Sequence, residues 1–121
     1  MTTFTRPIDH MAEDELLHAL LELLALCGWR AYHVRPSDPS EVLCLGSDGF
    51  PKIIAVHPLL HRLVAIECAP DRTLPSTGQL AWLLELRHHP TLEATIVRPG
   101  TYDAAIDWIR GRGPMPDARI R

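Results

Sequence analysis

The stretch Gly49–Ala69, GFPKIIAVHPLLHRLVAIECA, decides the fold class of this chain. It contains two short apolar segments, Lys52–His57 and Leu63–Cys68, which are separated by a turn at Pro58. Apolar runs of this length, rich in Ile and Val and bounded by turn residues, predict β-strands. We therefore expect the two segments to form an antiparallel pair.

Helical patterns precede and follow this pair. Leucines recur at helical spacing from Ala12 to Cys27, and Gly28 then suits the end of a helix. Ser76 and Gln79 form a capping-box pattern at the start of a second helix, which we expect to bury Trp82 beneath the sheet.

The remaining segments complete an α/β order. Trp29–Val34 and Leu92–Val97 predict strands, and Glu41–Leu45 is a candidate short extra strand. A last helix is expected from Thr101 to Ile109. This order predicts an α/β sandwich with a mixed central sheet.

Length and composition narrow the class of protein. A chain of 121 residues is typical of one domain, and we expect a flexible leader at 1–11, the domain at 12–110 and a flexible tail at 111–121. No segment is apolar enough to span a bilayer, and the start lacks the apolar core of a signal peptide. Three cysteines without framework spacing suit a reducing cytoplasm, so we expect a cytoplasmic protein with no membrane partner.

The strand pair resembles the core of the PD-(D/E)xK nuclease fold in its virus-type replication-repair (VRR-NUC) branch. In that branch Gly-x-Pro-Asp leads into one strand and Glu-x-Lys ends the next. Gly49, Pro51 and Glu67 match. Lys52 stands at the position of the metal-binding Asp, and Ala69 stands at the position of the catalytic Lys.

The resemblance extends over roughly residues 12–110 and implies a restriction-endonuclease-like helix–mixed sheet–helix sandwich. Glu13 matches an early carboxylate of the first helix, and Gln79 matches a glutamine of the helix that follows Glu-x-Lys. The closing strand and its turn at Pro99 also match. The degenerate site that the resemblance implies consists of Glu67, Lys52, Gln79 and Glu13.

Mg²⁺ needs hard oxygen ligands, usually two carboxylates on neighbouring strands. Strand alternation makes Glu67 and Ala69 face the same way, but Ala69 supplies only a methyl group. Lys52 cannot bind a metal because its ammonium group has no acceptor. If the strands pair, Lys52 lies near Glu67 and fills the space of the cation. We expect no bound metal, and Glu67 is the ligand if one binds.

Each site residue also has an ordinary structural interpretation. Glu67 can be a strand-end residue at a solvated edge, and Lys52 can be an exposed first strand residue. Glu13 can serve the helix dipole, and Gln79 can serve only the capping box.

Three functions are compatible with these features. The first is a non-cleaving nuclease-fold protein that binds nucleic acid or a protein partner, which would not be an enzyme and would need no cofactor. The second is an active Mg²⁺- or Mn²⁺-dependent endodeoxyribonuclease of the Holliday-junction-resolvase type, with Asp48 as a displaced carboxylate and Lys52 as a migrated catalytic lysine. The third is a protein-binding accessory or inhibitory module, which the net charge of −3 favours.

Nucleic-acid binding would involve basic and histidine side chains outside the strand pair. The candidates are Arg30, His33, Arg35 and Arg72. DNA binding further predicts that Arg98 and Lys52 share their face. The resemblance implies branched or single-stranded DNA as the partner, a homo-oligomer, and a bacterial or phage-infected host.

Overall fold

The computed structural model describes residues 12–35 and 49–117. The elements in chain order are α1 (Glu13–Leu26), β1 (Arg30–His33), β2 (Ile53–His57), β3 (Arg62–Cys68), α2 (Thr77–Arg87), β4 (Leu92–Val97), the 3-10 turn η3 (Pro99–Thr101) and α3 (Tyr102–Ile109). The candidate strand Glu41–Leu45 lies outside the described residues. Within the described part of the chain, no helix is long and apolar enough to cross a membrane.

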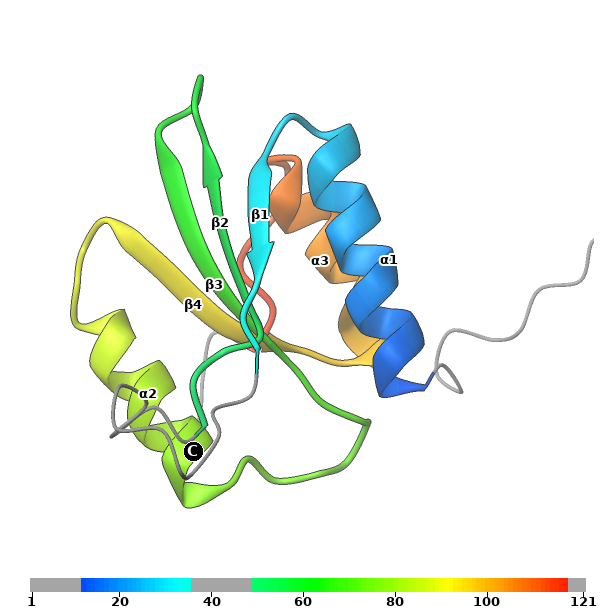
Figure 1. Ribbon diagram of the computed structural model, residues 1–121, viewed down its shortest axis with the longest axis vertical. Helices are drawn as coiled ribbons and strands as arrows, with labels where there is room; N and C mark the ends of the chain where they lie inside the picture. The colour runs from blue at the N-terminus through cyan, green and yellow to red at the C-terminus, as the bar shows by residue number, and fades with distance from the viewer. Residues whose placement is uncertain (1–11, 36–48, 118–121) are drawn as a thin grey trace, which may run out of the picture.

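The four strands form one mixed sheet in the order β1-β2-β3-β4 (Figure 1). β2 pairs antiparallel with both β1 and β3, whereas β3 and β4 are parallel and are joined through α2. The expected antiparallel pair is therefore confirmed, with Ile53 opposite Ile66. The mixed α/β class predicted from the order of patterns is also confirmed.

Helices cover the two faces of the sheet unequally. α1 and α3 lie on one face, and α2 lies on the other (Figure 1). The larger core lies under α1 and α3 and includes Leu16, Leu20, Leu24, Ile53, Val64, Ile66, Val97, Trp108 and Ile109. The smaller core lies under α2 and consists of Ala65, Ala69, Leu83, Ala94 and Ile96. α2 packs mainly on β4, and within the part of the chain that the structure describes Tyr32 of β1 and Val56 of β2 are exposed.

Trp82 is not buried beneath the sheet, so that expectation was wrong. The side chain of Trp82 is half-buried and packs edge-to-face on Phe50, with 4.7 Å between the ring centres. Leu83 is the fully buried residue of α2. The capping box fixed the start of this helix correctly, but the leucines on several sides of α2 left its inward face ambiguous.

The flexible tail expected at 111–121 is anchored as far as Asp117. The hydroxyl of Thr95 bonds the carbonyl oxygen of Pro116. Arg98 forms a salt bridge with the Asp117 carboxylate at 2.6 Å, and Arg87 donates to the Asp117 carbonyl oxygen at 2.7 Å. Glycine and proline in this segment exclude regular structure, but they do not exclude contacts with the domain.

A partly buried arginine ties α3 to the strands. Arg62 donates to both carboxylate oxygens of Glu93, at 2.9 and 2.8 Å, and to the carbonyl oxygens of Trp108 and Ile109 at the end of α3. The indole of Trp108 donates to Glu93 at 2.6 Å, and Arg62 also lies 5.0 Å from the ring centre of Trp29. This network satisfies the last carbonyls of α3 with a cation, which also suits the helix dipole.

His57 joins the β2–β3 turn to the end of α1. Its Nδ1 atom accepts from the backbone N–H groups of Leu59 and Leu60 at 3.3 and 3.1 Å. The proton of the neutral ring is therefore on Nε2, which lies 3.0 Å from the carbonyl oxygen of Cys27 and donates to it. Gly28 leaves room for this ring, because a Cβ atom there would lie 3.2 Å from Nε2.

We expect His57→Phe to lower the free energy of unfolding by about 1–3 kcal/mol, because three backbone groups lose their partner while the ring volume is kept. Urea denaturation followed by circular dichroism measures the loss. His18→Phe is the matched control, because His18 is exposed on α1 and its replacement should change stability by less than about 0.5 kcal/mol. Equal losses in the two variants would contradict the role of His57.

Candidate functional site

Glu67 lies inside the domain and not at a solvated edge. It sits near the end of β3 on the face that α2 covers, between Ala65 and Ala69, and only 2% of its surface is exposed. The carboxylate oxygen Oε1 accepts from the backbone N–H of Cys68 at 3.0 Å. A carboxylate buried to this degree requires hydrogen-bond and charge partners.

Lys52 supplies the opposite charge. The register of β2 and β3, continued one position beyond Ile53 and Ile66, places Lys52 opposite Glu67. The Lys52 ammonium lies 3.3 Å from Glu67 Oε1, as the sequence predicts for paired strands. The carbonyl oxygen of Lys52 accepts from the N–H of Val34 at 2.8 Å, so the end of β1 holds its backbone in place.

Two helices complete the site from their first turns. Glu13 of α1 lies 2.7 Å from the Lys52 ammonium, so the ammonium is held between two carboxylates. Gln79 of α2 donates from Nε2 to Glu67 Oε2 at 3.2 Å. Its other amide atom, Oε1, accepts from the N–H of Ser76 at 2.8 Å. Gln79 therefore serves the capping box and the site with one side chain.

The carboxylate and the ammonium respond differently to this environment. Burial raises the pKa of Glu67, and it outweighs the opposing effects of the Lys52 charge and of the hydrogen bonds from Cys68 and Gln79. Burial lowers the pKa of Lys52, but the hydrogen bond to Glu13 and the charge of Glu67 outweigh it, so the pKa lies above its ordinary value. Lys52 is therefore charged at neutral pH and does not act as a general base.

Gly49 and Pro51 shape the chain that leads to Lys52. Gly49 has a φ of +84°, and a Cβ atom there would lie 2.4 Å from the backbone of Gly78 and Gln79. The chain before β2 therefore packs directly against the first turn of α2. Pro51 is fully buried at the same place. The match of Gly49 and Pro51 to a strand-leading motif has a physical basis here, since the two residues position Lys52 and Gln79 together.

This arrangement does not fit a divalent cation as it stands. Three of the four acceptor positions of the Glu67 carboxylate are used by Lys52, Cys68 and Gln79. The Lys52 ammonium would also lie beside the metal and repel it. Among residues 12–35 and 49–117, no group of three His, Cys, Asp or Glu side chains is arranged to hold a metal ion. The site is a closed ion-pair network in which the Glu13 and Glu67 carboxylates share one ammonium.

The Cys68 thiol faces the other side of β3, within the larger core. Burial and the charge of Glu67 raise its pKa to about 12. A thiol in this environment is inert, so it adds no chemistry to the site.

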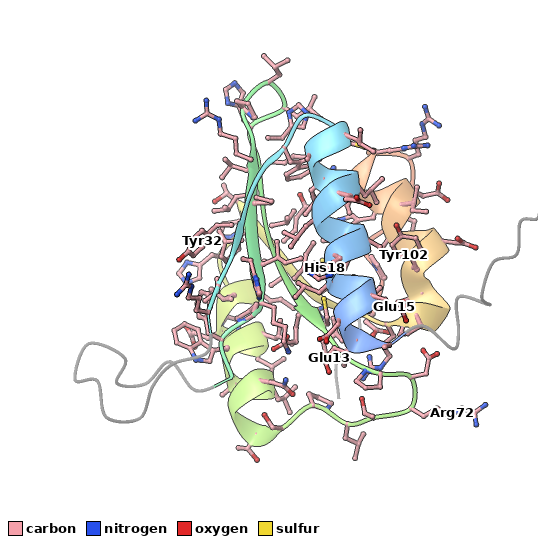
Figure 2. The ribbon with its side chains drawn as sticks, turned by 45° about the vertical axis from the view of Figure 1, so that its right-hand side comes forward. Glu13, Glu15, His18, Tyr32, Arg72 and Tyr102 are labelled. Carbon is pink, nitrogen blue, oxygen red and sulfur yellow. The ribbon has the colours of Figure 1, made fainter. Side chains whose placement is uncertain are left out.

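The candidate nucleic-acid-binding residues do not gather on one surface. Arg30 and His33 lie on β1, where the register opposite Val56 and Ile53 places them on different faces of the sheet. Arg35 follows β1 and is exposed. Arg72 lies on the loop before α2 and points away from the domain, below Glu13 (Figure 2). Arg98 is engaged by Asp117 and is therefore not free to bind a phosphate.

The displaced carboxylate considered for an active enzyme, Asp48, lies outside the described residues. Comparisons with protein-family models, with curated proteins and with solved structures found no match.

The sequence did not predict the hydrogen bond from the Cys68 N–H to Glu67, and it predicted the two roles of Gln79 only as alternatives. The backbone N–H of Cys68 bonds Glu67, but a backbone donor leaves no signal in the sequence. The contact of Gln79 with Glu67 and its capping role were treated as competing interpretations, although an amide has both a donor and an acceptor end. The capping box itself was the available signal, because it orients the donor end away from the helix.

We expect opposite results for two paired carboxylates, the buried Glu67 and the partly buried Glu93. Glu67→Gln should leave the free energy of unfolding unchanged or raise it by up to about 1 kcal/mol, because a buried charge is removed while Glu13 still pairs Lys52. Glu93→Gln is the matched control and should lower it by about 1.5–3 kcal/mol, since Arg62 loses a charged partner. Urea denaturation at pH 7 compares the two variants.

The pH dependence of the free energy of unfolding supplies a second measurement. The folded pKa of Glu67 lies above 4.5, so its contribution to stability falls as the pH rises from 4.5 through that pKa. The hydrogen bond from Arg62 lowers the pKa of Glu93 despite its partial burial, so its contribution is lost as the pH falls below 4.5 through that pKa. In each glutamine variant, the contribution of the replaced carboxylate should disappear from the curve of unfolding free energy against pH. A Glu67→Gln variant as unstable as Glu93→Gln would contradict the difference between the sites.

Gly49→Ala should lower the free energy of unfolding by more than about 2 kcal/mol, because it combines a left-handed backbone with a clash against α2. Gly111→Ala is the matched control, since Gly111 has a φ of +76° but no atom within 4 Å of an added Cβ. It should show the backbone cost alone, about 1 kcal/mol. Thermal and urea denaturation compare the variants, and equal losses would show that the approach of Gly49 to α2 is unimportant.

Proposed function

We propose that this chain is a non-cleaving member of the VRR-NUC type of nuclease fold that binds nucleic acid or a protein partner. The observation that supports this best is the position of the Lys52 ammonium between Glu13 and Glu67, at 2.7 and 3.3 Å. In the family that the chain resembles, a metal ion and its Asp ligand occupy this space. A permanent internal cation in that space pairs with both carboxylates and competes with a metal ion for them.

The residue at the lysine position supports the same proposal. Ala69 is buried under α2 and presents a methyl group on the face that Glu67 shares. It cannot stabilise the attacking water or the scissile phosphate, which is the role the resemblance assigns to a lysine there. Loss of both the metal ligand and the catalytic cation removes two groups that act as a unit. The proposal includes a restriction-endonuclease-like sandwich as the fold. It also includes the cytoplasm of a bacterium or of a phage-infected host as the location.

An active enzyme is the second candidate function, and the nearness of Lys52 to Glu67 favours it. In that case Lys52 would be a migrated catalytic lysine, Asp48 would supply the missing carboxylate, and Mg²⁺ or Mn²⁺ would be required. The raised pKa of Lys52 is compatible with a charged lysine that contacts a phosphate. The engagement of Glu67 by three donors weighs against it, because metal binding would have to displace at least one of them.

The local charge favours a protein partner over nucleic acid. The first turn of α1 carries Glu13, Asp14 and Glu15, and the site itself has two carboxylates for one ammonium. This excess of negative charge would repel a phosphate backbone at close range. Of the arginines near this end, Arg98 is already paired, and Arg72 points away from the acidic turn.

The test of the proposal removes the internal cation. Lys52→Asp should create a site for one Mn²⁺ ion together with Glu13 and Glu67, measured by isothermal titration calorimetry. Lys52→Leu is the matched control, because it removes the cation without adding a ligand and should bind Mn²⁺ at least about tenfold more weakly. The double variant Lys52→Asp, Ala69→Lys should then cleave DNA, with a stability loss of about 1–3 kcal/mol because Ala69 is buried.

The wild-type chain should cut neither branched nor single-stranded DNA in Mg²⁺ or Mn²⁺. Fluorescence anisotropy with the same DNAs measures binding without cleavage. Cleavage by the wild-type chain that disappears in Asp48→Ala would replace this proposal with the active enzyme. A folded double variant that binds Mn²⁺ and cuts no DNA would show that more of the site has been lost than Lys52 and Ala69 account for.

A further inference from the structure

Three leucines are exposed at one end of the sheet. Leu59 and Leu60 lie in the turn between β2 and β3 and are 82% and 55% exposed, and Leu26 ends α1 and is 85% exposed. The turn and the end of α1 lie at the same end of the domain (Figure 1). A single exposed leucine is ordinary, but several at one place indicate a surface that contacts another molecule.

His57 fixes the backbone beside these leucines. Its ring accepts from the N–H groups of Leu59 and Leu60 and donates to the carbonyl oxygen of Cys27, which follows Leu26 in the chain. One imidazole therefore joins the turn to the end of the helix. Because the backbone on both sides of the ring is already held, a partner can bind here with little further loss of backbone freedom.

The charged residues around the leucines are basic. Three stretches of chain meet at this end, namely 26–30, 58–62 and 109–113. Together they contain four arginines and no Asp or Glu. Arg62 is paired with Glu93. The other three arginines are exposed, namely Arg30, Arg110 and Arg112. This end of the domain therefore combines apolar and positively charged side chains.

The opposite end of the sheet differs in charge. It holds the Glu67 site and the acidic first turn of α1, which begins at Glu13 (Figure 1). The described ranges also begin or end toward it, at Ala12, Arg35, Gly49 and Asp117. An anionic partner is therefore attracted to the end that carries the leucines and is repelled from the other.

We propose that the leucine surface, made of Leu26, Leu59, Leu60, Arg30, Arg110 and Arg112, binds an acidic segment of a partner protein that carries apolar side chains. The inference rests on the protein partner included in the proposed function, and it adds where that partner binds and what its chemistry is. Apolar side chains of the segment would cover the leucines. Its carboxylates would pair with the arginines, whose planar groups suit bidentate contact with a carboxylate.

The combination of leucine and arginine favours this partner over DNA and over a lipid surface. Contacts with a phosphate backbone would use the arginines but leave the leucines in water. An anionic membrane would attract the same arginines, but the net charge of −3 opposes accumulation of the chain at a negative surface. A protein segment can supply apolar groups and carboxylates together.

A random peptide library displayed on phage is the probe, with the wild-type chain as the target. We expect the selected peptides to hold more Asp and Glu than Lys and Arg, and at least two apolar residues. Fluorescence anisotropy with a labelled synthetic copy of one peptide then measures affinity. Its affinity should fall at least about fivefold in Leu59→Ser and in Arg110→Gln. A copy with Gln and Asn in place of its acids should bind the wild-type chain at least about fivefold more weakly.

Leu74→Ser and Arg72→Gln are the matched controls. Leu74 is 90% exposed and Arg72 is exposed, but both lie on the loop before α2, which runs below Glu13 (Figure 2). Neither variant should change the affinity by more than about twofold. Leu59→Ser should also leave the midpoint of urea denaturation unchanged, because the replaced side chain is exposed.

Several results would overturn the proposal. They are a library that yields no binding peptide or only basic peptides, and equal losses of affinity in the Leu59 and Leu74 variants. Tighter binding of duplex DNA or of phosphatidylglycerol vesicles than of every selected peptide would assign the surface to nucleic acid or to lipid instead. A lower urea midpoint in Leu59→Ser would show that another part of the chain covers this leucine. Cleavage of DNA by the wild-type chain would contradict the proposed function but would leave these binding results unchanged, so the two failures are distinguishable.

Discussion

A single buried carboxylate, that of Glu67, sets the requirements that the surrounding chain meets. A charge so deep in an α/β domain must be paired and hydrogen-bonded. Lys52 meets the first requirement from the neighbouring strand, and Gln79 and the Cys68 N–H meet the second. Glu67 has these partners only if β2 and β3 keep their register and α2 begins at Thr77. The ordered contacts of the site therefore depend on the same register as the core.

The domain holds a second paired carboxylate, partly buried, with a different role. Glu93 forms a bidentate pair with Arg62 and accepts from Trp108, and the hydrogen bond from Arg62 lowers its pKa. Glu67 has one cation and an amide, and burial raises its pKa. Glu93 is thus arranged to stabilise its charge, whereas Glu67 is not fully compensated. This difference supports the proposal that places the functional site at Glu67.

Strand pairing and the helix start were predictable because they rest on local patterns. The Ile- and Val-rich runs indicated β2 and β3, their expected pairing, as in the family that the chain resembles, placed Lys52 near Glu67, and the capping box located α2. The inward face of α2 was not predictable, since its leucines point in several directions and Leu83 alone is fully buried. The contacts of the segment before Asp117 were also hidden, because they join residues about 20 to 30 positions apart.

The position of the site between two helix starts explains how it persists without a second cation. Glu13 lies in the first turn of α1, and Gln79 holds Glu67 beside the first turn of α2. Each helix N-terminus carries the equivalent of about half a positive charge. Two such ends and the Lys52 ammonium offset part of the charge of the two carboxylates, and the excess that remains is negative. In the proposed nuclease fold, Lys52 at the position of an acid therefore changes the charge balance of the site, while β2 and β3 keep their register around Glu67.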